Sequence, residues 1–150
     1  TKMPSPFQTR NIAHLTADFT TVKTVVASTA LTAADTGKLI VVDLVAPGAD
    51  TTITLPAPVI GLTYRIIVWK DDDGSDDLIV ATAASTSLFK GGVIHADTNA
   101  DNLSVQAPFS SEDTWTFVDA EAGTDVTFVC DGTHWYTTGV VVSADVPTIA

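Results

Sequence analysis

Short apolar runs, separated from one another by turn-forming residues, dominate the chain from residue 20 onward. Runs of this length that are rich in Val, Ile, Thr and aromatic residues are typical of β-strands, because branched and aromatic side chains pack well on a pleated surface. The pattern predicts strands at Thr21–Ala27, Leu39–Val45, Thr51–Leu55, Thr63–Trp69, Leu78–Thr82, Val93–His95, Leu103–Gln106, Trp115–Val118, Thr124–Cys130 and His134–Val142.

Apolar and polar residues alternate within several of these runs, which is the period of a strand with one buried face. Ile53 and Leu55 would share one face, while Thr52 and Thr54 would share the other. Short strands with turn signals at such spacing are typical of a sandwich or a barrel. We therefore expect an all-β fold, either an antiparallel β-sandwich or a tulip-like barrel.

The clearest local signal is the turn Asp131–Thr133, which lies between two apolar runs. Asp-Gly favours a tight hairpin turn, because glycine accepts a positive φ without steric cost. The sequence therefore predicts a hairpin over Thr124–Val142. The pair Gly91-Gly92 predicts another turn, and Leu31–Lys38 is the only segment expected to be helical, over about one turn.

The first residues of the chain do not follow this strand pattern. Pro4 and Pro6 each fix φ and remove a backbone donor, which disfavours a helix and keeps the segment extended. The apolar residues there are isolated and follow no regular period. We therefore expect two parts: an extended N-terminal arm at residues 1–19 and a single β-sandwich domain at residues 20–150.

The charge of the chain restricts its partners. The formal net charge is −11, with seven Lys and Arg against 18 Asp and Glu. Binding to nucleic acid or to an anionic membrane depends on Lys and Arg, so neither partner is expected. No apolar stretch approaches the ~20 residues of a spanning helix, and the N-terminus lacks the layout of a signal peptide. We expect synthesis in a cytoplasm.

Candidate catalytic and metal-binding residues form no recognisable motif. His14, His95 and His134 fall in three separate segments without the spacing of metal ligands. The acidic run Asp71–Asp77 offers oxygen ligands of the kind that Ca²⁺ prefers, but it departs from the EF-hand pattern. We interpret it as a solvated hairpin loop, with a weak Ca²⁺ site as the alternative. The lone Cys130 excludes an intramolecular disulfide. The sequence predicts a protein that is not an enzyme, with no catalytic residue, cofactor or metal.

Aromatic residues occur in several of the predicted strands, with Trp69, Trp115 and Trp135 beside Tyr64 and Tyr136. Large aromatic side chains most often anchor a core or a subunit interface. Aligned rings on one face of a sheet can also stack on sugars, so a carbohydrate platform is the alternative.

Two parts of the sequence resemble a pattern that recurs in structural proteins of tailed bacteriophages. The first part comprises Leu31–Lys38, Ile53–Pro58 and Gly61–Ile66. The second part, Gly123–Tyr136, is similar to the closing hairpin of the same proteins. The resemblance spans about residues 31–142. The chain is most similar to head decoration (cement) proteins, since no long shaft of the kind found in fibres is visible.

This resemblance implies a homotrimer on the capsid exterior of a virion, which binds the major capsid protein and stabilises the head by bridging capsid subunits. The arm would be the principal contact, because each of its apolar side chains would gain roughly 1.5–3 kcal/mol if buried on a partner. The expected capsid-contact residues are Met3, Phe7, Arg10, Ile12 and Leu15. The alternative is a tail fibre, spike or baseplate module that binds a host receptor or glycan.

Overall fold

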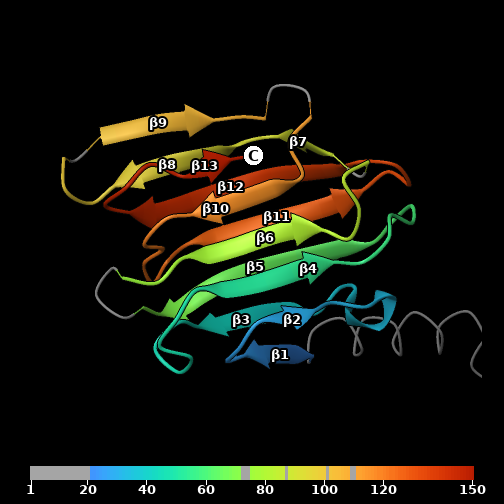
Figure 1. The fold of residues 1–150 in the computed structure, drawn as a ribbon, viewed down its shortest axis with the longest axis horizontal. Coiled ribbons are helices and arrows are strands. Elements are labelled where there is room, and N and C mark those ends of the chain that lie inside the picture. Colours follow the sequence, from blue (N-terminus) through green and yellow to red (C-terminus); the bar gives the residue numbers. More distant parts are fainter. Residues whose placement is uncertain (1–20, 72–74, 87, 101, 109–110) are drawn as a thin grey trace, which may run out of the picture.

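The computed structural model describes residues 21–71, 75–86, 88–100, 102–108 and 111–150. In this part of the chain two β-sheets lie one in front of the other (Figure 1). The expected all-β, sandwich-like fold is confirmed. The predicted arm at residues 1–19 lies outside the described residues.

The larger sheet of the described chain has eight strands and the smaller sheet has five. The larger sheet contains, in spatial order, β1 (Val22–Val25), β3 (Leu39–Asp43), β5 (Thr63–Lys70), β11 (Asp125–Cys130), β12 (Trp135–Ser143), β8 (Val93–Asp97) and β9 (Asn102–Gln106), with β7 (Phe89–Gly91) also paired to β12. The smaller sheet contains β13 (Thr148–Ile149), β10 (Thr114–Phe117), β6 (Leu78–Thr82), β4 (Thr51–Leu55) and β2 (Thr29–Ala30). No helix in the described segments has the length and apolar character needed to cross a membrane.

The sheets are mixed, which corrects the expectation of a purely antiparallel sandwich. Strands β1, β3 and β5 run parallel in the larger sheet, and β2, β4 and β6 run parallel in the smaller one. The chain passes from one sheet to the other after each of these strands, so that successive strands of one sheet point the same way. The same turn-forming residues serve hairpins and crossings between sheets, and therefore the sequence pattern did not distinguish the two.

The resulting first half of the sandwich is a parallel coil, in which each full circuit of the chain adds one strand to each sheet (Figure 1). Val22 pairs with Leu39, and Leu39 in turn pairs with Arg65. The second half of the chain contains two hairpins, β8–β9 and β11–β12. The antiparallel pair β11 and β12 joins the coil through β5, and it confirms the hairpin predicted around Asp131–Thr133.

The predicted strands correspond to observed ones, with β4 and β6 matching at both ends. The helical turn expected in Leu31–Lys38 is a 3₁₀ turn at Ala33–Asp35. Three short strands were missed: β2, β7 and β13. The predicted turn at Gly91-Gly92 is instead a one-residue gap, at Gly92, between β7 and β8, which both run parallel to β12. Gly91 has a φ of +84°, and a Cβ there would press on the Thr137 carbonyl oxygen.

Aromatic side chains join the two sheets in the core. Trp115 of the smaller sheet lies with its ring centroid 6.4 Å from that of Phe89, and its indole Nε1 donates a hydrogen bond to Thr137 Oγ1 over 3.2 Å. Trp135 is fully buried, and its ring centroid lies 5.7 Å from that of Tyr64. Offset and tilted ring pairs of this kind stabilise a core beyond the area that they bury. The Trp115–Phe89 contact and the hydrogen bond to Thr137 link the two sheets, whereas Trp135 and Tyr64 pack within the larger sheet.

A buried carboxylate ties the start of the coil together. Asp35 accepts hydrogen bonds from Lys23 Nζ and Lys38 Nζ, each at 2.9 Å, and from the backbone N–H and the hydroxyl of Thr32. Burial alone would raise the pKa of Asp35, but these charged and neutral donors outweigh it and hold the pKa far below its usual value. Burial, followed by the nearby negative charge of Asp35, raises the pKa of Tyr64 to about 12. Asp35 thus joins β1 to the 3₁₀ turn.

Candidate interaction surface

The capsid-contact residues predicted from the sequence, Met3, Phe7, Arg10, Ile12 and Leu15, lie outside the described residues. Their contact role stays a prediction. The described chain offers a different candidate surface, on the side of the larger sheet that faces away from the smaller one.

An uncharged apolar strip covers this outer face where β12, β8 and β9 lie side by side. Six side chains form the apolar strip: Val140, Val142, Ile94, Ala96, Leu103 and Val105. Leu103 is 77% exposed and Val105 is 73% exposed. They alternate along β9 with the polar residues Asn102, Ser104 and Gln106, so that the apolar face of this strand points to solvent. Exposed apolar groups gathered in this way mark surfaces that bind other proteins.

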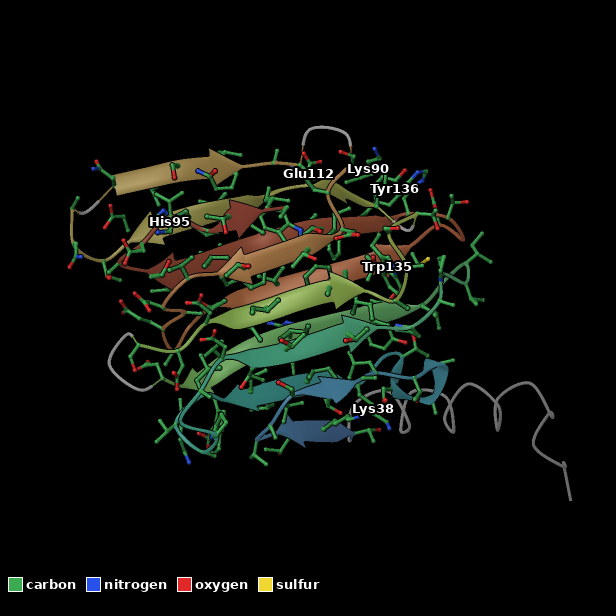
Figure 2. All side chains as sticks on the ribbon, viewed as in Figure 1. Lys38, Lys90, His95, Glu112, Trp135 and Tyr136 are labelled. Carbon is green, nitrogen blue, oxygen red and sulfur yellow. The ribbon has the colours of Figure 1, made fainter. Side chains whose placement is uncertain are left out.

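Hydrogen bonds anchor β9 to the rest of the sheet. His95 of β8 is buried, and its Nε2 lies 3.1 Å from the Ser143 carbonyl oxygen of β12. The Ser104 hydroxyl of β9 lies 3.4 Å from His95 Nδ1. The carbonyl oxygen can only accept, so the ring N–H at Nε2 donates to it. His95, the middle residue of β8 (labelled in Figure 2), is therefore a structural histidine that links three strands.

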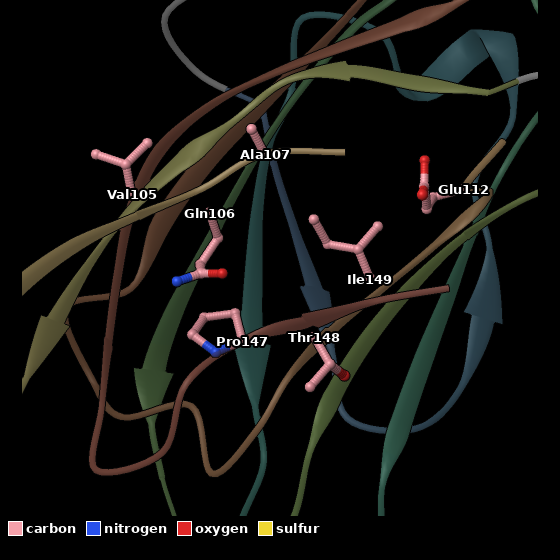
Figure 3. A pocket seen from close by; sticks show the side chains of 7 residues that line it. All are labelled: Val105, Gln106, Ala107, Glu112, Pro147, Thr148 and Ile149. Carbon is pink, nitrogen blue, oxygen red and sulfur yellow. The ribbon is translucent and has the colours of Figure 1, made fainter. Parts of the chain in front are cut away.

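A groove separates the edges of the two sheets at β9 and β13 (Figure 3). Its volume is about 400 Å³, and its lining mixes apolar and polar groups from Val105, Gln106, Ala107, Glu112, Pro147, Thr148 and Ile149. Glu112 is the one charged residue of this lining. The groove borders the apolar strip through Val105, which belongs to both.

Acidic residues gather at the end of the sandwich where β5 leaves the larger sheet and β6 enters the smaller one. Asp50 accepts a hydrogen bond from the Asp77 backbone N–H, and Asp77 accepts one from the Asp119 backbone N–H. Asp71 accepts a hydrogen bond from the Ala122 backbone N–H over 2.7 Å. We call this region the acidic end. Its carboxylates hold neighbouring loops together by satisfying their backbone donors.

The acidic run Asp71–Asp77 therefore differs from the predicted hairpin loop, because it connects the two sheets. Asp76 within it is 9% exposed, so the run is not solvated throughout. Residues 72–74 lie outside the described part of the chain. Among the described residues no group of three or more His, Cys, Asp and Glu side chains is placed to hold a metal ion.

Most of the described cations serve structural ion pairs. Lys23 and Lys38 bind Asp35, and Lys70 Nζ lies 2.8 Å from Asp43 Oδ2. The hydrogen bond from Lys70 is the main cause that holds the pKa of Asp43 below its usual value.

A further ion pair lies on the outer face of the larger sheet. Arg65 donates two hydrogen bonds to the Asp125 carboxylate, over 3.0 and 2.6 Å. This pair lies on the outer face beside the apolar strip, since Asp125 is opposite Val140.

The second described histidine, His134, also has a structural partner. Its Nδ1 lies 3.6 Å from Asp131 Oδ2 in the β11–β12 turn. The Asp131 carboxylate accepts hydrogen bonds from the backbone N–H groups of His134 and Thr133, which lower its pKa. His14 lies outside the described residues. The described histidines thus take part in holding a sheet and a turn.

The tryptophans divide into core and surface residues. Trp115 and Trp135 are fully buried, which confirms their interpretation as core anchors. Trp69 is 50% exposed, and Lys70 Nζ lies 4.6 Å from its ring centroid. Tyr136 is 46% exposed and lies opposite Lys90 of β7.

The two exposed rings of the described residues, Trp69 and Tyr136, lie far apart on the outer face. Strands β5 and β12 are both antiparallel to β11, which lies between them, so they run in the same direction. Trp69 is near the end of β5, whereas Tyr136 is near the start of β12. The two rings therefore lie at opposite ends of the sheet and do not form one carbohydrate platform.

Comparison with known proteins adds no relative: no protein-family model matches the sequence, and a search of curated proteins finds no match.

Proposed function

We propose that the chain is a structural protein of a phage head, which binds the outer surface of the capsid and stabilises it by bridging capsid subunits. The observation that carries this proposal is the apolar strip, an uncharged surface on a strongly acidic protein. The phage-like motifs at Leu31–Lys38 and Gly123–Tyr136 support the choice of partner.

Binding energy is all that such a function requires. Burying Leu103 or Val105 on a partner would contribute roughly 1.5–3 kcal/mol each. The acidic end would remain in solvent, where its charge keeps decorated particles apart. The N-terminal arm, with Met3, Phe7, Arg10, Ile12 and Leu15, would supply a second contact to a neighbouring subunit. Two linked contacts hold more tightly than either contact alone, because the second forms without loss of translational freedom.

A role in binding also fits the way in which the ionisable residues are used. His95, His134 and Asp35 each have hydrogen-bond or ion-pair partners that join strands or turns. Each of these groups stabilises the fold through its contacts, and the proposed function assigns no catalytic role to them.

The test uses phage heads that lack this chain, prepared from the phage that encodes it. We expect the added chain to bind in numbers comparable to the capsid subunit and to raise the temperature at which the heads release DNA. Ile94→Asp, which places a charge in the middle of the apolar strip, should lower the bound copy number at least tenfold. Ile60→Asp makes the same change in an exposed loop outside the strip and should bind normally. Heads that gain neither copies nor thermal stability would contradict the proposal.

The second candidate is a tail fibre, spike or baseplate module that binds a host receptor or glycan. The half-exposed ring of Trp69 on the outer face favours it, because a single exposed indole can stack on one sugar. A few copies per virion, together with glycan binding that Trp69→Ala abolishes, would replace the first proposal with this one.

A further inference from the structure

Five strands of the described chain pair along one side only, namely β1, β2, β7, β9 and β13, and β9 differs from the other four. An edge strand exposes backbone N–H and C=O groups that pair readily with another strand, so proteins guard their edges with charges or keep them very short. Strands β1 and β7 carry Lys23 and Lys90, and β2 and β13 are each two residues long. Strand β9 has five residues and no charge, proline or glycine. In the described chain it pairs with β8 alone.

The sequence of β9 complements itself in an antiparallel pair. If Ser104 of one copy lies opposite Ser104 of a second copy, Leu103 faces Val105 of that copy, and Asn102 faces Gln106. Side chains directly opposite in antiparallel strands lie in contact, and aliphatic pairs there are favourable. Leu103 and Val105 already share the outer face, so both aliphatic pairs form on the same side.

This pairing also extends the apolar strip without interruption. The observed registers place Val140 beside Ile94 and Ile94 beside Val105, and they place Val142 beside Ala96 and Ala96 beside Leu103. Across the two copies one row would read Val140, Ile94 and Val105, then Leu103, Ala96 and Val142 of the second copy. Its symmetry mate reads the same in the opposite direction. Each position in both rows is apolar.

Charge favours the antiparallel arrangement as well. Each copy has a net charge of −11, and the β8–β9 turn carries Asp97, which accepts hydrogen bonds from the backbone N–H groups of Asn99 and Ala100. In an antiparallel pair this acidic turn lies beside Gln106 and Ala107 of the second copy, which carry no charge themselves, with Glu112 as the one charged residue of the adjoining groove. A parallel pair would bring the two acidic turns together.

We propose that two copies of this chain associate through antiparallel pairing of their β9 strands about Ser104. The result is a twofold dimer in which the two larger sheets form one continuous sheet. Such an edge contact is smaller than a standard protein interface, so the dimer exchanges with monomer as the concentration changes. A homotrimer, as the phage resemblance implies, has a different symmetry and does not arise from this pairing.

The first test measures the mass of the full chain by sedimentation and light scattering over a range of concentrations. We expect the mass to rise from one chain toward two. Leu103→Lys places a charge on the edge and should keep the mass at one chain at the concentrations where the wild-type chain is dimeric. The matched control is Ile60→Lys, because Ile60 and Leu103 are both 77% exposed. The control should dimerise as the wild type does.

A trimeric mass, a monomer at every concentration, or a Leu103→Lys variant that still dimerises would overturn the proposal. Circular dichroism of both variants checks that their folds are retained.

A second test reads the register directly through disulfide formation between copies. Cα atoms of directly opposed residues are about 4.5–5.5 Å apart, within the range that a disulfide spans, whereas diagonal neighbours are about 7–8 Å apart. An oxidised mixture of Leu103→Cys and Val105→Cys chains should yield cross-linked heterodimers. Leu103→Cys alone should cross-link several-fold less. The native Cys130 is buried and contributes no background. Equal cross-linking in both samples would refute the register.

Discussion

The two halves of the sandwich differ in how their neighbouring strands are connected along the chain. From β1 to β6 the chain is a parallel coil, in which the neighbours within a sheet are a full circuit apart along the sequence. From β8 to β13 the chain forms two hairpins, β8–β9 and β11–β12, which are joined by the parallel pairing of β8 with β12. The coil depends on contacts between distant segments, whereas a hairpin forms from a short one. Local turn chemistry therefore specifies the two hairpins, whereas the coil needs buried groups such as Asp35 to join its circuits.

The hairpin half should be most sensitive to added volume between its strands. Gly139 has a φ of +149°, and a Cβ there would press on the Asp125 carbonyl oxygen of β11. Gly139→Ala combines backbone strain with overpacking, so we expect a loss of about 4 kcal/mol in the free energy of unfolding. Urea denaturation followed by tryptophan fluorescence measures this loss.

The control lies in the coil half. Gly37 has a φ of +76°, but no atom lies within 4 Å of the position that a Cβ would take, so Gly37→Ala should cost only about 1 kcal/mol. Equal losses for the two variants would show that the close approach of β11 and β12 is unimportant.

The coil half should be most sensitive to loss of its buried carboxylate. Asp35→Ala leaves Lys23 and Lys38 without their partner, so we expect a loss of about 3 kcal/mol. Asp125→Ala breaks an ion pair whose two side chains are much more exposed, and it should cost less than about 1 kcal/mol. The same urea titration compares them. A smaller loss for Asp35→Ala than for Asp125→Ala would contradict the role assigned to Asp35.

Lowering the pH should also affect the two halves differently, with a smaller loss of stability than the substitutions above. The pKa of Asp35 is far lower in the folded chain than the unfolded value of about 3.9. A carboxyl group of this kind stabilises the fold fully above its unfolded pKa and loses that contribution as the pH falls toward its folded pKa. The melting temperature should therefore be level from about pH 7 to 5 and fall below about pH 4. Asp35→Asn should reduce this acid-induced fall in melting temperature more than Asp131→Asn does. Asp131 is the matched residue of the hairpin half, because its pKa is also lowered.

Strand positions could be predicted from the sequence because burial on one face imposes a period of two. The run Thr51–Leu55 shows this, since Thr51, Ile53 and Leu55 are buried while Thr52 and Thr54 are partly exposed. The pairing of the strands could not be predicted. No local feature of the sequence near Leu39 indicates that Leu39 pairs with Arg65 in the adjacent strand. By contrast, Asp131-Gly132 specifies its hairpin locally, and that prediction was confirmed.

The candidate surface was missed for a related reason. Leu103 and Val105 were placed in a predicted strand, and an alternating strand normally turns its apolar face inward. In β9 the inward position belongs to Ser104, which bonds to His95. Only the sheet order reveals that β9 is an edge and that its apolar residues face solvent.

The parallel pairing of β1 with β3 has a mechanical consequence. A pull on the chain at Thr21, directed along the strand axis, loads the hydrogen bonds between β1 and β3 in shear, so the four residues of β1 must yield together. A hairpin pulled apart at its open end, in contrast, unzips one bond at a time. A tether attached in front of β1 would therefore resist tension best when the force runs along the sheet, and least when it peels β1 away from the edge.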